Sequence, residues 1–215
     1  MTNKLWVYID HFKGEVLPAS WEAIGAGKTL ANDLGGLVTA LVFGDGVNDL
    51  AQQAFHNGAD EVVLADDPTL ADYRSEAFAA LLAKLAGDSA PEAILFPTTT
   101  RGRELAGMAA VDLESGVLVD VTSLEVKDGT ILATRPIYAG KLLATVQCNA
   151  KPQIITLRGR AFAKSDLDES RTGTINEVDA VLSEDEIAVK VMEYAQAEAG
   201  VSLTDAAVIV SGGRG

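Results

Sequence analysis

The residues best suited to chemistry form a glycine-rich turn, Ser211-Gly212-Gly213-Arg214, after an apolar run at residues 208–210. The apolar run predicts a β-strand that leads into the turn. Backbone amides of such a turn can approach an anion closely, because glycine has no side chain to stand in the way. The arginine adds a forked donor that stays charged and suits a phosphate group or an electron-rich ring.

A turn of this kind normally opens a new βα unit. We therefore expect two parts in the chain: a first domain at residues 1–200, and a linker with the first strand and turn of a second domain at residues 201–215.

A second candidate site contains Thr98, Thr99, Arg101 and Arg103, directly after the apolar residues 93–96. The apolar run predicts a strand, and the threonines can cap a helix. Anions bind at such junctions, because N–H groups at the start of the helix point toward them. Two interpretations stay open: a phosphate site, or a capped helix that presents its arginines to a partner protein.

Two other motifs resemble phosphate or magnesium sites but lack essential parts. Residues 25–29 (GAGKT) resemble the end of a P-loop, but Glu22 stands where that loop needs its first glycine, so we expect a helix. Residues 44–49 (GDGVND) match the magnesium-binding run of haloacid-dehalogenase-type phosphatases. The aspartyl nucleophile motif of those enzymes is missing, so we expect a βα turn with an Asx-type cap.

Composition excludes several further classes of protein. The chain has 215 residues, 48% of them hydrophobic, which is enough for a sizeable globular core. Its net charge of -14 opposes binding to nucleic acids and to anionic membranes, and favours basic partners. His11, His56 and the single cysteine Cys148 leave little material for a metal site or a nucleophilic triad, so we expect no metal and no catalytic residue.

Targeting signals are also missing from the sequence. The first residues show no secretory or mitochondrial leader, and no apolar run is long enough to span a bilayer. One cysteine suits a reducing compartment. We expect a cytoplasmic protein without membrane insertion.

The first half of the chain alternates between predicted strands and predicted helices. Ser20 is the expected cap of the first helix, which should end at Gly35. This alternation predicts an α/β fold with a doubly wound, mostly parallel sheet. The predicted strands span residues 4–10, 37–43, 61–65 and 93–96, and the predicted helices end at about residues 34, 57, 86 and 114.

The second half predicts an antiparallel strand meander. Asp128-Gly129 between the alternating residues 119–126 and 130–136 is a strong hairpin signal. Further strands are expected over residues 142–148, 153–157 and 175–182. The capping box at residues 183–186 predicts a helix over residues 187–199, and an edge strand is the alternative.

The order of five short motifs resembles the electron-transfer flavoprotein alpha subunit. The resemblance covers essentially the whole chain, and the most specific motif is the terminal one. Gly159 is a departure, since the family often has proline there, and it puts only a local turn in doubt. The motifs are residues 96–105 (FPTTTRGREL), 116–122 (GVLVDVT), 135–141 (RPIYAGK), 152–158 (PQIITLR) and 211–215 (SGGRG).

The resemblance implies a Rossmann-like fold, related to adenine-nucleotide-hydrolase-like domains, that acts as a scaffold. It also implies a heterodimer with a beta subunit, and an FAD that carries electrons from dehydrogenases, such as the acyl-CoA dehydrogenases of fatty acid β-oxidation, to a respiratory-chain or other acceptor. Arg214 would contact FAD, with Ser211, Gly212 and Gly213 shaping the turn. We expect an electron-carrier subunit, not an enzyme, that retains little FAD without the rest of the cofactor domain. The resemblance favours an edge strand over residues 187–195. A stand-alone nucleotide-binding module is the alternative function.

Overall fold

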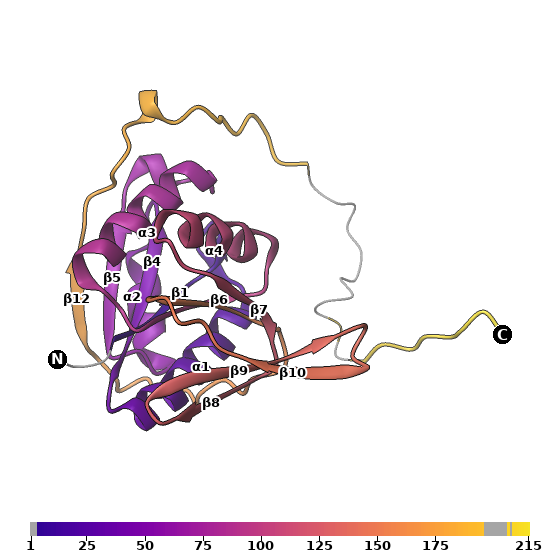
Figure 1. The fold of residues 1–215 in the computed structure, drawn as a ribbon. Helices are drawn as coiled ribbons and strands as arrows, with labels where there is room; N and C mark the ends of the chain where they lie inside the picture. Colours follow the sequence, from indigo (N-terminus) through magenta and orange to yellow (C-terminus); the bar gives the residue numbers. More distant parts are fainter. Residues whose placement is uncertain (1–3, 196–205, 207) are drawn as a thin grey trace.

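The computed structural model describes residues 4–195, 206 and 208–215, and its centre is a seven-stranded sheet. Every neighbouring pair in this sheet is parallel. The strand order is β12-β5-β4-β1-β6-β11-β7 (Figure 1). The strands are β1 (Lys4–Tyr8), β4 (Leu37–Gly44), β5 (Glu61–Asp66), β6 (Ala93–Pro97), β7 (Val117–Val121), β11 (Gln153–Leu157) and β12 (Thr174–Glu177).

Helices cover both faces of the sheet. Two of them share one apolar core with one face, and the other two share a second core with the opposite face (Figure 1). No helix in the described ranges is both long enough and apolar enough to cross a bilayer. The first pair is α1 (Pro18–Leu34) and α2 (Asn48–His56); the second pair is α3 (Ser75–Ser89) and α4 (Thr100–Asp112); the short 3-10 turns are η1 (Pro68–Leu70) and η2 (Glu184–Glu186).

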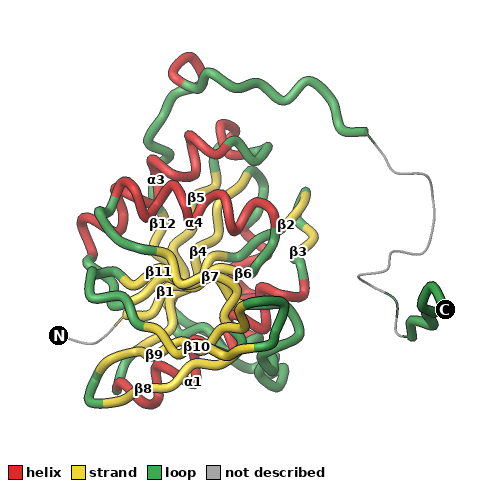
Figure 2. Tube along the Cα trace, turned by 45° about the vertical axis from the view of Figure 1, so that its right-hand side comes forward, coloured by secondary structure: helices red, strands yellow, loops and turns green. Residues whose placement is uncertain are grey.

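A separate antiparallel sheet lies against the α1 side of the molecule. It consists of β8 (Ser123–Lys127), β9 (Thr130–Ile137) and β10 (Leu142–Val146), with β9 in the middle. Figure 2 shows these strands together at the bottom of the view, below the main sheet. A small hairpin of β2 (His11–Phe12) and β3 (Glu15–Val16) follows the central strand β1.

The predicted fold class is confirmed, but the sequence placed three strands in the wrong sheet. The run predicted over residues 119–126 breaks at Thr122, so that its first part, β7, joins the parallel sheet and its second part, β8, does not. The strand predicted over residues 153–157, β11, also joins the parallel sheet. The strand predicted over residues 175–182 is limited to β12, which pairs in parallel with β5. Every residue of β11 is buried, as expected for a strand with helices or sheet on both faces. The meander is therefore limited to β8, β9 and β10, with the predicted Asp128-Gly129 turn between β8 and β9.

The prediction of a helix or an edge strand after Ser183 was wrong for residues 187–195, which form neither; residues 196–199 lie outside the described residues. The capping box does form, but it closes only the single turn η2. The N–H groups of Ala188 and Val189 then donate to the carboxylate of Glu76 on α3, at 2.8 and 3.2 Å. The Glu76 side chain thus binds the backbone N–H groups that a helix or a β-sheet would need for its own hydrogen bonds.

Two predicted helix caps were also wrong. Ser20 lies inside α1, where its hydroxyl accepts from the N–H of Asp10 at 2.9 Å and donates to the Asp10 carbonyl at 3.1 Å. Before α2, the cap position is Val47 without a side-chain cap, and Asp66 accepts from the Gly46 N–H instead. The predicted end of α1 is confirmed, since Gly35 adopts the left-handed conformation with φ 64°.

The position of β11 predicts how its two central isoleucines respond to truncation. Ile154 packs into the α3–α4 core and Ile155 into the α1–α2 core, both fully buried. Ile154→Ala and Ile155→Ala should each lower the free energy of unfolding by about 2–5 kcal/mol in urea titrations. Leu143→Ala on exposed β10 is the control and should change it by about 0.5 kcal/mol or less. Tolerance of either isoleucine change would contradict burial on both faces.

Candidate functional site

The strand order places a topological switch point between β1 and β6. From β1 the chain proceeds to β4 and β5 on one side, and then crosses to β6 on the other side. In open α/β sheets, ligands bind outside the carboxyl ends of the strands at this point. The residues there are Asp10, which follows β1, and Thr98, Thr99 and Arg101, which join β6 to α4.

Asp10 is fully buried at the end of the central strand, and Arg101 neutralises it. One guanidinium nitrogen of Arg101 lies 2.9 Å from a carboxylate oxygen of Asp10. Burial raises the pKa of Asp10, and the Thr99 hydroxyl and the Arg101 charge offset only part of this effect. Arg101, one of the two arginines predicted to bind an anion, is therefore paired with a carboxylate of the domain itself.

The first turn of α4 sits directly on the end of β6. Thr99 caps this helix as predicted, because its hydroxyl accepts from the N–H of Gly102 at 2.9 Å. A side chain at Gly102 would come within 2.2 Å of the Pro97 carbonyl oxygen, so the glycine permits this close packing. Thr98 is half-buried beside it, and its N–H donates to the carbonyl of Leu157.

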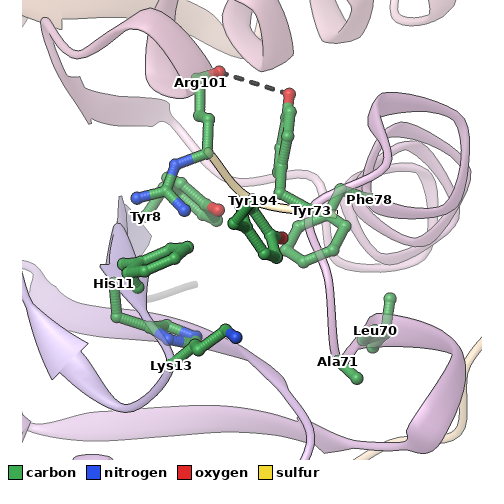
Figure 3. A pocket seen from close by; sticks show the side chains of 10 residues that line it. Tyr8, His11, Lys13, Leu70, Ala71, Tyr73, Phe78, Arg101 and Tyr194 are labelled. Atoms are coloured by element: carbon green, nitrogen blue, oxygen red, sulfur yellow. Dashed lines mark hydrogen bonds between the residues drawn. The ribbon is translucent and has the colours of Figure 1, made fainter. Parts of the chain in front are cut away.

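Aromatic and basic side chains line the crevice beside Arg101 (Figure 3). Tyr194 comes from the segment after η2; its ring meets Phe12 edge-on at 5.1 Å, and its hydroxyl donates to Asp72 at 2.7 Å. Lys13 lies 4.8 Å from the centre of the Tyr194 ring. The hydroxyl of Tyr73 donates to the main-chain carbonyl of Arg101, the bond drawn in Figure 3.

The crevice is closed by these side chains. Its volume is about 20 Å³, enough for one water molecule, whereas small-molecule pockets hold roughly 300–1,000 Å³. A nucleotide does not fit in this arrangement. Of the two interpretations of the segment after β6, the geometry favours a capped helix over a phosphate site: Arg101 turns inward, and Arg103 stays exposed on α4.

The structure does not bring the other predicted site, the glycine-rich turn at residues 211–214, to this crevice. Residues 208–215 are exposed and form no regular element, so the strand predicted over residues 208–210 is absent; residues 201–205 and 207 lie outside the described residues. No hydrogen bond or ion pair links Ser211, Gly212, Gly213 or Arg214 to the rest of the described chain. The described residues alone therefore do not enclose FAD, and the role of Arg214 stays a prediction.

Sequence reasoning missed two residues that shape the crevice. Asp10 could have been found, because a charged residue directly after an apolar central strand is placed at the ligand-binding edge of the sheet. Tyr194 gave no such signal, since its partners Phe12 and Asp72 lie more than a hundred residues away in sequence. No cluster of metal-ligating side chains is found among the residues that the structure describes.

Fold and site together define an α/β domain of the nucleotide-binding type whose switch-point crevice is filled by its own side chains. The family model described as "Electron transfer flavoprotein domain" matches residues 5–183. The chain therefore belongs to the electron transfer flavoprotein family.

Curated relatives are similar over nearly the whole chain. Protein FixB of Azorhizobium caulinodans is 37% identical over 218 residues, which cover 98% of this chain and 59% of that protein. The electron transfer flavoprotein subunits alpha of Thermoanaerobacterium thermosaccharolyticum and Bacillus subtilis are 34% and 32% identical, covering 98% and 100% of this chain and 65% of each relative. The chain thus spans about three fifths to two thirds of the length of these relatives.

The ion pair in the crevice predicts a pH-dependent loss of stability. Arg101→Met leaves the Asp10 carboxylate buried without its counter-ion, which should cost about 3 kcal/mol of unfolding free energy at pH 7. The folded-state pKa of Asp10 is already raised and would rise further, so the loss should shrink as the pH falls and Asp10 gains its proton. Urea titrations at pH 7 and pH 5 measure this difference.

Asp10→Asn supplies the matched control for this prediction. In that background Arg101→Met removes no counter-ion, so it should cost less than in the wild-type protein and show no pH dependence. Equal losses in both backgrounds would show that Arg101 stabilises the fold by packing alone.

Proposed function

We propose that this chain is the scaffold domain of an electron transfer flavoprotein alpha subunit. In this proposal it pairs with a beta subunit and helps to position an FAD that is held mainly by other parts of the assembly. The assembly passes electrons from flavoprotein dehydrogenases, such as acyl-CoA dehydrogenases, to a respiratory-chain or other acceptor. The domain itself performs no catalysis.

The observation that carries this proposal is a family match over residues 5–183 combined with a crevice that has no room for a nucleotide. A stand-alone nucleotide-binding module would need the switch-point crevice open. Here Tyr194 and Arg101, which is paired with the buried Asp10, line a crevice of only about 20 Å³. A domain with this fold and a filled crevice is suited to support a cofactor bound elsewhere.

Arg214 is the residue of this chain that we propose for contact with FAD. A bound flavin supplies the redox chemistry, and a nearby guanidinium would stabilise the negative charge of its reduced form. Ser211, Gly212 and Gly213 would let the backbone approach the cofactor closely. This turn is exposed.

Gel filtration of the chain mixed with its cognate beta subunit and FAD tests the proposal. The two proteins should elute together with little absorbance at flavin wavelengths, because the described residues do not enclose FAD. Arg214→Gln is a suitable control and should leave the protein pairing unchanged. Flavin that elutes with the complex would refute the cofactor part, and nucleotide binding without any pairing would favour the stand-alone module.

A further inference from the structure

An open groove lies between the main sheet and the antiparallel sheet, and none of its lining residues lines the switch-point crevice. Its volume is about 600 Å³. The ends of β7 and β11 contribute one wall, and the end of β9 with the turn toward β10 contributes the other. The groove is lined by Asp120, Arg158, Arg135 and residues 136–140.

Positive charge is concentrated in this groove although the whole chain carries a net charge of -14. Asp120 holds Arg158 through both of its carboxylate oxygens, with a distance of 2.9 Å from Arg158 Nε to Oδ1. Arg135 lines the same groove, and its buried Nε has no hydrogen-bond partner within the described part of the chain. The three lining charges sum to one surplus positive charge. The hydrogen bond from Arg158 lowers the pKa of Asp120 most, and the charges of Arg135 and of Arg103 on α4 lower it further.

The backbone around the groove is held in a conformation that most residues avoid. Asp120, Tyr138 and Ala139 all have positive φ angles, at 60°, 50° and 55°. The N–H of Asp120 donates to the Thr156 hydroxyl at 2.9 Å, which fixes the carboxylate that orients Arg158. Strained backbone of this kind concentrates at functional sites, where it aims particular side chains.

Apolar side chains form the rim of the groove. Tyr138 is 75% exposed at its edge, and Leu142 and Leu143 on β10 are 55% and 71% exposed. These leucines pair across the sheet with Ile137 and Pro136 of the groove wall. Arginine and tyrosine beside exposed apolar surface are typical of energetically important protein interfaces. A small anion would gain nothing from such a rim.

We propose that this groove docks the partner subunit, and that the partner inserts an acidic side chain between Arg135 and Arg158 while an apolar side chain of the partner packs on Tyr138. This inference rests on the proposed function, because it assigns a surface to the beta subunit named there. A carboxylate fits the forked guanidinium of Arg158, which lines the groove and has donors beyond those bonded to Asp120. The partner's apolar side chain would cover surface that otherwise faces water.

The experiment measures the affinity of the full chain for its cognate beta subunit by analytical ultracentrifugation. Arg158→Glu reverses the groove charge, and Tyr138→Asn removes the exposed ring while keeping a residue that tolerates positive φ. Each should weaken binding at least tenfold. Lys84→Glu on α3, across the main sheet from β9, makes the same charge change as Arg158→Glu and should leave the affinity within twofold. Unfolding midpoints confirm that each variant is folded.

Salt dependence separates charge recognition from simple packing. The affinity of the wild-type chain should fall as the salt concentration rises from about 50 to about 300 mM, because salt screens exposed charges. The Arg158→Glu variant should lose most of this salt dependence. If both groove variants bind the beta subunit as strongly as the wild-type chain does, this inference is overturned and the proposed pairing is left intact. Failure of the wild-type chain to bind the beta subunit would refute the pairing itself, and the docking surface with it.

Discussion

A buried carboxylate at the end of the central strand is the constraint on which the functional account depends. Asp10 follows β1, where neighbouring side chains fill both cores of the sheet, and it is removed from water completely. A charge in that position requires a counter-ion, and Arg101 provides it from the first turn of α4. The pair fixes α4 against β1, and it fills the crevice where domains of this architecture bind nucleotides.

Filling the crevice changes which surfaces of the domain remain available for interaction. The rings of Phe12 and Tyr194 cover the switch point, while the groove between Asp120, Arg135 and Arg158 stays open at the carboxyl ends of β7 and β11. The crevice pairs the charges of Asp10 and Arg101 inside the domain, and the groove keeps charge and apolar surface exposed. An electron-carrier subunit needs surfaces for its partners more than a substrate pocket of its own, and this division matches that need.

The sequence predicted those features that depend on neighbouring residues. The alternation of strands and helices, the Gly35 helix end, the Thr99 cap and the Asp128-Gly129 turn are local, and all are confirmed. It failed where distant residues compete for the same groups: Glu76 takes the N–H groups of Ala188 and Val189, and β11 inserts between β6 and β7. The sequence pointed to the crevice through the junction that follows the strand predicted over residues 93–96, but its closure by Tyr194 depends on contacts that no local pattern encodes.

Hydrogen–deuterium exchange of the chain, alone and with its cognate beta subunit, tests most directly whether this domain is a docking scaffold with a filled crevice. The account predicts added protection in the peptides that contain the groove, around residues 118–122, 134–146 and 158, and unchanged exchange around Asp10 and Thr98–Arg103 when AMP or ATP is added instead. Protection at the crevice by a nucleotide, with none at the groove from the beta subunit, would contradict the account.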